Sequence, residues 1–284
     1  MTDPVTVPSA DTPAEEFLEV PGGRVHMFRA GEGEPLLFLH AAGGAGAWLD
    51  FHRLLAGGGY DVIAPDHPGF GKSDDFPEVE AMDDLVYHYL DLLDALGLER
   101  AHVVGASFGG WVAAELAVAA PHRVGSLALL SAAGLRLPEH PVPDIFLMPS
   151  AELVATLFHN PPPAPAPAAS AAPDIDAVLA AYRDATALAR FSWVPFLSNP
   201  KLERRLRRIT APTLVAAPSD DRLIPVAHAQ RYASRITGAR FAEVPDCGHA
   251  MYFERPAEFA DVILGFLARN GLPTLPTLSN GVSR

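Results

Sequence analysis

Short apolar runs alternate with longer stretches of helical periodicity along most of this 284-residue chain. The apolar runs occupy residues 36–39, 62–64, 101–104, 126–130, 213–217 and 240–244. Runs of this length, separated by helical patterns, predict a mostly parallel β-sheet covered by helices on both faces. Near the start of the chain, residues 17–20 and 25–29 flank Pro21-Gly22-Gly23 and predict a hairpin.

The clearest helical pattern covers residues 82–96. Its apolar side chains recur at helical spacing at Leu85, Tyr89, Leu92, Leu93 and Leu96. In a parallel sheet, the loops at the carboxyl ends of the strands gather along one edge. We therefore expect functional side chains just after the apolar runs.

A long interval between predicted strands, residues 135–208, exceeds the length of an ordinary connection between a strand and a helix. It holds helical patterns of its own at residues 150–159 and 174–191, and the prolines and alanines at 160–173 predict an exposed, partly extended strap. The predicted domains are a flexible N-terminus (1–16), a core in two parts (17–134 and 209–270), the insertion (135–208) and a flexible tail (271–284).

Composition narrows the class of protein. Hydrophobic residues make up 49% of the chain, enough for one substantial domain with an insertion. A net charge of −13 and a pI near 5.2 argue against nucleic acid as a partner. We expect neither a signal peptide nor a membrane span, because no basic start and no run of roughly 18 apolar residues occurs. Cys247 is the only cysteine, so we expect a cytoplasmic protein without disulfides.

The histidines outside the motifs described below show no spacing typical of metal ligands, so we expect no metal site. We interpret His26, His88, His122 and His159 as surface or packing residues. His228 follows Pro225 on a predicted helix and is expected to face solvent.

Ser107 lies in the run Gly105-Ala106-Ser107-Phe108-Gly109, directly after a predicted strand and directly before an alanine-rich helix. A serine in such a sharp turn adopts a strained backbone that lifts its hydroxyl into a cleft. The helix that follows directs its N–H groups and positive dipole end towards the serine. This context predicts a nucleophile for acyl transfer.

An acid and a histidine are then sought further along the chain. The strand at 213–217 leads to Asp220 and Asp221, and a carboxylate there would lie at the cleft edge. His249 follows the strand at 240–244, so it can converge with Ser107 and an aspartate. Cys247 is close by, but Ser107 already supplies the nucleophile.

From about residue 17 to residue 267 the chain resembles the α/β-hydrolase superfamily. Residues 36–44 are similar to the family's His-Gly loop, residues 65–73 to its Asp-x-x-Gly-x-Gly-x-Ser turn, and residues 249–256 to its closing Gly-His-x(4)-Glu-x-Pro motif. Two departures are Ala41 in place of the usual glycine after His40, and Pro218 where glycine is usual before the acid.

The resemblance implies roles for individual residues. The family's acid stands four residues before a proline, which selects Asp221 over Asp220 because Pro225 follows at that spacing. The oxyanion hole would consist of the backbone N–H groups of Phe108 and Ala42. No cofactor or metal is implied.

In the family, the position of the 135–208 insertion carries a helical lid over the serine. The tentative pocket residues are His40, Phe146, Met148, Phe191, Trp193 and Phe196, with Leu197 and Leu147 of similar character. The apolar residues among them are also explained if they simply pack the lid onto the body.

These residues predict a cofactor-free serine hydrolase in which His249 is the general base for Ser107 and Asp221 orients the imidazole. The expected substrate is a small molecule, an ester or lactone with an apolar acyl group. The alternative is hydrolysis of a carbon–carbon bond in a vinylogous diketone, because residues 199–206 resemble a segment of enzymes with that activity, although Ala250 stands where they usually carry tryptophan. An alternative of another class is a slow-turnover, receptor-like hydrolase. Aspartate is absent from the nucleophile position, which disfavours dehalogenase and epoxide hydrolase chemistry.

Overall fold

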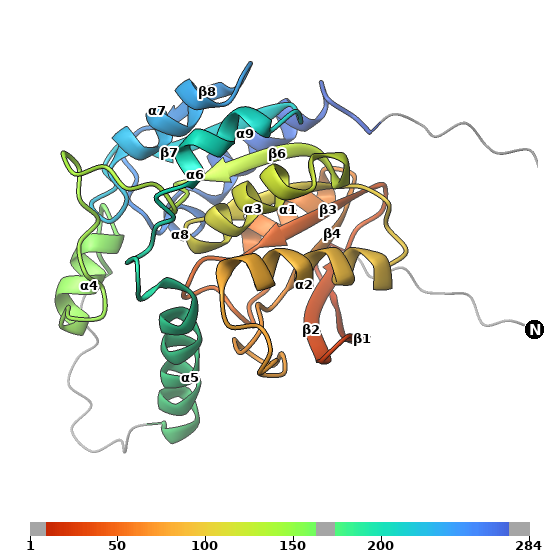
Figure 1. Cartoon of the computed structure of the whole chain (residues 1–284), viewed down its shortest axis with the longest axis horizontal. Coiled ribbons are helices and arrows are strands. Elements are labelled where there is room, and N and C mark those ends of the chain that lie inside the picture. The colour runs from red at the N-terminus through yellow and green to blue at the C-terminus, as the bar shows by residue number, and fades with distance from the viewer. Residues whose placement is uncertain (1–9, 163–173, 273–284) are drawn as a thin grey trace, which may run out of the picture.

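The computed structural model describes residues 10–162 and 174–272, which form one eight-stranded sheet with helices around it (Figure 1). The strand order is β1-β2-β4-β3-β5-β6-β7-β8, with antiparallel pairing of β1 with β2 and of β2 with β4, and parallel pairing elsewhere. The strands are β1 (Ala14–Val20), β2 (Gly23–Ala30), β3 (Glu34–Leu39), β4 (Tyr60–Pro65), β5 (Ala101–Ala106), β6 (Val124–Leu130), β7 (Thr213–Pro218) and β8 (Arg240–Val244).

Helices cover both faces of the sheet, and the sheet separates the apolar core into two clusters. One cluster packs against α2 (Met82–Ala95), α3 (Phe108–Ala119) and α7 (Val226–Arg235). The other packs against α1 (Asp50–Gly57), α8 (Met251–Glu254) and α9 (Pro256–Leu267). The remaining helices are η1 (Pro121–Arg123), α4 (Ser150–Leu157), α5 (Ile175–Ser192), α6 (Leu202–Arg205) and η2 (Leu206–Arg208). Strands β5, β6 and β7 are buried throughout their length, as the apolar runs predict for strands covered on both faces.

The predicted sheet, the flanking helices and the opening hairpin are confirmed, but two predicted boundaries are wrong. Ala14–Glu16 belong to β1 rather than to a flexible N-terminus, because they pair with residues 27–29 near the end of β2. Leu272 does not belong to a free tail, since its backbone N–H donates to Oε1 of Glu34 at 2.7 Å. Residues 1–9, most of the predicted strap (163–173) and the rest of the predicted tail (273–284) lie outside the described residues.

Helices α4 and α5 lie outside the two helical layers (Figure 1). The loop after β4 holds α5, because the Arg183 guanidinium donates to the carbonyl of Gly71 at 2.9 Å and that of Arg190 to the carbonyl of Asp75 at 2.9 Å. The end of α4 is held by the loop after β8, where the N–H of Ala250 donates to the carbonyl of Leu157 at 2.8 Å. The insertion is therefore fixed to the edge of the sheet where the parallel strands end.

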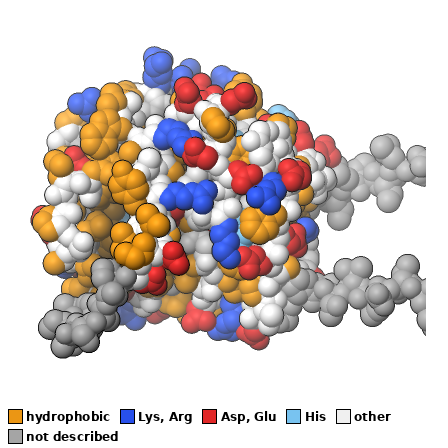
Figure 2. Space-filling view, turned by 90° about the horizontal axis from the view of Figure 1, so that it is seen from below, with side chains coloured by type: hydrophobic (Ala, Val, Ile, Leu, Met, Phe, Trp, Pro, Cys, Tyr) orange, Lys and Arg blue, Asp and Glu red, His pale blue; other side chains and the backbone are white. Residues whose placement is uncertain are grey.

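The outer surface of α5 is apolar. Ile175, Val178, Leu179 and Tyr182 are exposed there, and apolar side chains gather on this side of the molecule (Figure 2). No helix in residues 10–162 or 174–272 has the length and apolar character needed to cross a membrane.

Candidate active site

Ser107 connects β5 to α3 through a strained turn. Its φ is 52° and its ψ is −114°, a backbone conformation that is rare for a residue with a side chain. The turn is held because the N–H of Ser107 donates to the carbonyl of Leu130 at 2.8 Å, while its carbonyl accepts from Trp111 and Ala133.

The glycines around Ser107 are required by close contacts with neighbouring chain segments. A Cβ on Gly109 would lie 2.2 Å from the carbonyl oxygen of Leu39, and one on Gly105 would lie 2.3 Å from the carbonyl oxygen of Gly109. A side chain at either position would force α3 away from the sheet. The glycine spacing therefore brings the start of α3 close to the end of β3.

Ser107, His249 and Asp221 form one hydrogen-bonded chain. The Ser107 hydroxyl donates to Nε2 of His249 at 2.9 Å, and Nδ1 of His249 donates to Oδ2 of Asp221 at 2.8 Å. The three residues are each only 7% exposed. This arrangement fixes the imidazole tautomer that leaves Nε2 free to accept the serine proton.

Asp221 is satisfied by further donors. Its Oδ1 accepts from the backbone N–H groups of Leu223 and Ile224 at 2.9 and 2.7 Å, and its Oδ2 also accepts from the hydroxyl of Ser131 at 2.6 Å. Sequence reasoning missed Ser131, although its position directly after β6 is the signal that singled out the other site residues. Four hydrogen bonds hold the carboxylate in the orientation that faces His249.

Asp220 points away from the hydrogen-bonded residues Ser107, His249 and Asp221. Its Oδ2 accepts from the Arg222 guanidinium at 2.6 Å and lies 2.9 Å from Nδ1 of His159. The structure thus distinguishes the two adjacent aspartates in the way that the proline spacing implied.

His40 lies behind the loop that faces Ser107, not in the cavity. Its Nε2 accepts from the backbone N–H of His67 at 3.0 Å, so the ring proton is on Nδ1 and is donated to the carbonyl of Ala41 at 2.6 Å. Nε2 of His67 in turn donates to the carbonyl of His40 at 2.9 Å, and its Nδ1 accepts from the Tyr89 hydroxyl. Burial lowers the pKa of both His40 and His67, so the pair is neutral and holds the loop in place.

The loop after β3 and the start of α3 face the same cavity. Ala42 and Phe108 both line it beside Ser107. Phe108 is the first residue of α3, so its N–H has no hydrogen-bond acceptor within the helix. The two residues predicted to form the oxyanion hole thus line the same cavity as Ser107.

The cavity has a volume of about 440 Å³ and is mostly apolar. Its lining comprises Ala41, Ala42, Gly43, Ser107, Phe108, Ile145, Phe146, Leu153, Leu157, Phe158, Ala181, Asp184, Ala185, Leu188, Leu197, Leu223, His249, Ala250, Tyr252 and Phe253. Among these residues there is no lysine or arginine.

Only one of the tentative pocket residues lines this cavity, namely Phe146; Leu197 also lines it. The prediction is wrong for His40, Met148, Phe191, Trp193 and Phe196. Phe191 stacks on Phe108 with ring centroids 6.2 Å apart, whereas Trp193 and Phe196 pack against Phe146 at 5.2 and 6.0 Å. Helix α5 presents Ala181, Asp184, Ala185 and Leu188 to the cavity at helical spacing. Phe191 follows one turn later on the same side of the helix, past the cavity, where it packs on Phe108.

Asp184 is a charged residue of the cavity that sequence reasoning missed. Its Oδ1 accepts from the backbone N–H of Gly71 at 3.0 Å, and burial raises the pKa of its carboxyl group. The signal for it was present, since an aspartate interrupts the otherwise small or apolar face of Ala181, Ala185 and Leu188.

His228 and Cys247, two further residues near the site, are both buried. His228 is buried rather than exposed, because α7 packs on the sheet and Nε2 of His228 donates to the carbonyl of His140 at 2.8 Å. Cys247 is buried, and burial raises the pKa of its thiol to about 12, which makes it a poor nucleophile. Within the residues that the structure describes, no group of three or more His, Cys, Asp or Glu side chains is placed to hold a metal ion.

Comparisons with known proteins find similarity to hydrolases. The model of the alpha/beta hydrolase family matches residues 36–262. The 2-hydroxy-6-oxo-6-phenylhexa-2,4-dienoate hydrolase of Comamonas testosteroni is 32% identical over 272 residues, covering 86% of this chain and 91% of that protein. The 2-hydroxy-6-oxononadienedioate/2-hydroxy-6-oxononatrienedioate hydrolase of Paraburkholderia phymatum is 33% identical, covering 95% of this chain and all of that protein (100%).

Solved structures extend the similarity to the whole fold. The crystal structure of a membrane phospholipase A superimposes with a TM-score of 0.75 at 28% identity, covering 91% of this chain and 87% of that one. The structure of a serine hydrolase involved in carbazole degradation gives a TM-score of 0.71 at 25% identity, covering 91% of this chain and 100% of that one.

Proposed function

This chain belongs to the alpha/beta hydrolase family, and on that premise we propose that it is a serine hydrolase whose nucleophile is Ser107. The observation that carries the proposal is the hydrogen-bonded chain from Ser107 through His249 to Asp221, at the wall of an apolar cavity. The named relatives are hydrolases, in agreement with an enzymatic role.

The proposed mechanism follows from the hydrogen bonds. Nε2 of His249 accepts the Ser107 proton as Oγ attacks a carbonyl carbon, and Asp221 stabilises the imidazolium that forms. The N–H groups of Phe108 and Ala42 receive the negative charge that develops on the carbonyl oxygen. His249 then returns the proton to the leaving group, and water releases the acyl group from the serine.

Hydrolysis of a carbon–carbon bond in a vinylogous diketone is the first candidate reaction. The names of the similar proteins, hydrolases of 2-hydroxy-6-oxo-dienoates, support this alternative more than they support hydrolysis of the ester or lactone expected from the sequence. Such a reaction needs the same nucleophile and oxyanion donors as ester hydrolysis. Its leaving group is a carbanion that conjugation stabilises, so His249 would deliver a proton to carbon.

Ester hydrolysis is the second candidate, and the charge of the cavity favours it. The substrates in the relatives' names are carboxylates, whereas this cavity holds the carboxylate of Asp184 and, among its described lining residues, no lysine or arginine. An anionic substrate would have no counter-charge there. An uncharged ester with an apolar acyl group fits the lining better.

We further propose that residues 135–208 act as a lid. Helix α4 contributes Leu153 and Leu157 to the cavity, and α5 contributes Ala181, Ala185 and Leu188, so the insertion supplies much of the apolar wall. Removal of these helices would expose the site to water.

The test compares three substrates under one set of conditions. These are 2-hydroxy-6-oxo-6-phenylhexa-2,4-dienoate, its methyl ester, and p-nitrophenyl butyrate, with the Ser107→Ala protein as the control in each assay. Release of benzoate from either dienoate supports carbon–carbon bond hydrolysis, and release of p-nitrophenol alone supports the esterase.

Turnover also separates these enzymes from a receptor-like protein. Slow, sub-stoichiometric release with tight binding of the product would favour the receptor. Release from all three substrates that is equal in the wild type and in Ser107→Ala would contradict the proposed nucleophile.

A further inference from the structure

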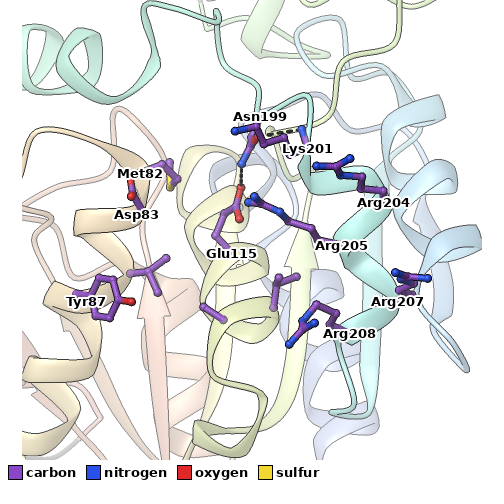
Figure 3. A pocket seen from close by; sticks show the side chains of 13 residues that line it. Met82, Asp83, Tyr87, Glu115, Asn199, Lys201, Arg204, Arg205, Arg207 and Arg208 are labelled. Atoms are coloured by element: carbon purple, nitrogen blue, oxygen red, sulfur yellow. Dashed lines mark hydrogen bonds between the residues drawn. The ribbon is translucent and has the colours of Figure 1, made fainter.

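A second hollow, with a volume of about 740 Å³, lies on the flank of the molecule between α2, α3 and the segment formed by α6 and η2 (Figure 3). It is lined by Met82, Asp83, Val86, Tyr87, Glu115, Val118, Ala119, Asn199, Lys201, Arg204, Arg205, Arg207 and Arg208. Glu115 at its floor is eight residues along α3 from Ser107, or about 12 Å along the helix axis. None of its lining residues belongs to the cavity beside Ser107.

Five cationic side chains line the hollow, and the described part of the chain offers them no ion pair. Lys201 and the arginines at 204, 205, 207 and 208 have no carboxylate oxygen within 4.0 Å, whereas Arg231 and Arg235, on the neighbouring helix, both pair with Glu203. None of the five side chains donates a hydrogen bond to another described residue. The hollow thus holds cations whose donors are available to a ligand.

This cluster has an energetic cost. The cations recur three or four residues apart along one short helical segment, and like charges at that spacing destabilise a helix. The cluster overlaps residues 199–206, none of which lines the cavity beside Ser107. In a chain of net charge −13, five cations gathered in one hollow favour a local anion.

The carboxylates of the hollow do not neutralise it. Glu115 is buried, and its Oε1 accepts from Nδ2 of Asn199 at 2.6 Å and Nε1 of Trp111 at 3.2 Å. Figure 3 shows the Arg205 guanidinium directed towards Glu115 and the Arg208 side chain below it, while Asp83 lies on the opposite wall. Five cations therefore face two carboxylates.

We propose that this hollow binds a phosphate-bearing anion that has an apolar part. The planar guanidinium groups of Arg205 and Arg208 match phosphate oxygens with paired N–H donors, and Lys201 adds a mobile charge. Met82, Val86 and Val118 form an apolar wall beside Tyr87, which suits the carbon skeleton of the ligand. A soluble organic phosphate and the headgroup of an anionic lipid share this chemistry.

The test measures binding without reference to hydrolysis, so its outcome is independent of the proposed function. Wild-type protein is titrated with pyrophosphate by calorimetry at low and at physiological salt, and its co-sedimentation with phosphatidylglycerol vesicles is compared with that on phosphatidylcholine vesicles. The same measurements are made on Arg205→Gln/Arg208→Gln. The matched control is Arg136→Gln/Arg240→Gln, which removes the same charge from exposed arginines outside the hollow. Unfolding temperatures without ligand show whether each variant is folded.

We expect pyrophosphate to bind the wild type and the control alike, with an affinity that falls as salt rises, and to bind the Arg205/Arg208 variant about tenfold or more weakly. Sedimentation with phosphatidylglycerol that depends on the same two arginines, without pyrophosphate binding, would identify a lipid headgroup as the source of the phosphate. The proposal is overturned if neither probe binds, or if both double variants lose binding equally. If Arg205→Gln/Arg208→Gln does not fold, Lys201→Gln with Arg208→Gln makes the same comparison.

Discussion

The carboxylate of Asp221 accepts hydrogen bonds from His249, from Ser131 and from two backbone N–H groups, whereas Asp220 one residue earlier pairs with Arg222 at the surface. At the scale of single residues, function in this molecule therefore depends on which way neighbouring side chains point. These contacts direct Asp221 at the imidazole of His249, whereas Asp220 lies beside that of His159.

Substitution of the two aspartates tests this assignment. Asp221→Asn should lower kcat by roughly 10⁴, because the imidazole loses both its tautomer and its stabilising charge. Asp220→Asn, the matched control, should lower it less than about tenfold, as surface changes usually do. Steady-state hydrolysis of one substrate by both variants checks this, and a larger loss in Asp220→Asn would mean that the register is displaced by one residue.

Asp184 gives a second prediction, on substrate charge. Because its carboxylate lies in the cavity, Asp184→Asn should raise kcat/KM for a substrate with a carboxylate by about tenfold and leave kcat/KM for the corresponding methyl ester nearly unchanged. Asp176→Asn removes the same charge from the exposed start of α5 and should change neither value. An equal effect of both variants on both substrates would show that Asp184 does not face the substrate.

At the scale of elements, the positions of strands and turns were predictable where they depend on a short, regular stretch of sequence. The apolar runs located each parallel strand, and the Gly-x-Ser-x-Gly spacing located the turn between β5 and α3, because close backbone contacts there exclude side chains. The direction in which α5 presents its residues was not predictable. It depends on how Arg183 and Arg190 dock that helix on a loop more than a hundred residues earlier, and periodicity within the helix carries no information on such a contact.

The close approach of α3 to β3 predicts a large effect of one methyl group. Gly109→Ala should destabilise the protein by about 2 kcal/mol or more, because its Cβ would lie 2.2 Å from the carbonyl oxygen of Leu39. Gly265→Ala, in the last turn of α9 with nothing within 4 Å of its Cβ, should be neutral or stabilising by up to about 1 kcal/mol. Urea unfolding of both variants measures the difference, and similar midpoints would refute the packing argument.

Helix α2 carries a buried histidine that predicts acid sensitivity. Burial lowers the pKa of His88 to about 4, below the value of roughly 6.5 for an unfolded chain. The unfolded state therefore binds the proton more readily. The free energy of unfolding is consequently highest above pH 6.5, and it decreases as the pH falls towards 4. His88→Leu should remove about 2 kcal/mol of the stability change between pH 7 and pH 5.

The comparison for His88 is His122→Leu, at an exposed position. Chemical unfolding at pH 7 and pH 5 gives the stability change for each protein. The wild type and His122→Leu should lose stability in parallel, and an unaltered loss in His88→Leu would show that another group is responsible.

At the scale of the whole molecule, the sheet brings three distant segments to one edge and the insertion covers them. Chain order and strand ends were enough to predict Ser107, an aspartate and His249 as neighbours, since parallel strands end along a common edge. The family's proline spacing was needed to choose Asp221 over Asp220. The composition of the cavity was not predictable, because its walls come from α4, α5 and the loops after β3 and β8 together. For the same reason, the sequence alone did not reveal that the described lining residues include no cation. This lack of a cation is the observation that bears most on the choice of substrate.

Covalent labelling tests whether Ser107 is a nucleophile activated by His249 and Asp221. Wild-type protein is treated with an alkyl fluorophosphonate, and the adduct is located by peptide mass spectrometry. We expect one adduct, on Ser107, and a rate of labelling that falls by orders of magnitude in Asp221→Asn. Ser107→Ala should form no adduct and should hydrolyse none of the substrates that the wild type cleaves. An adduct on another residue, or undiminished hydrolysis by a folded Ser107→Ala protein, would contradict it.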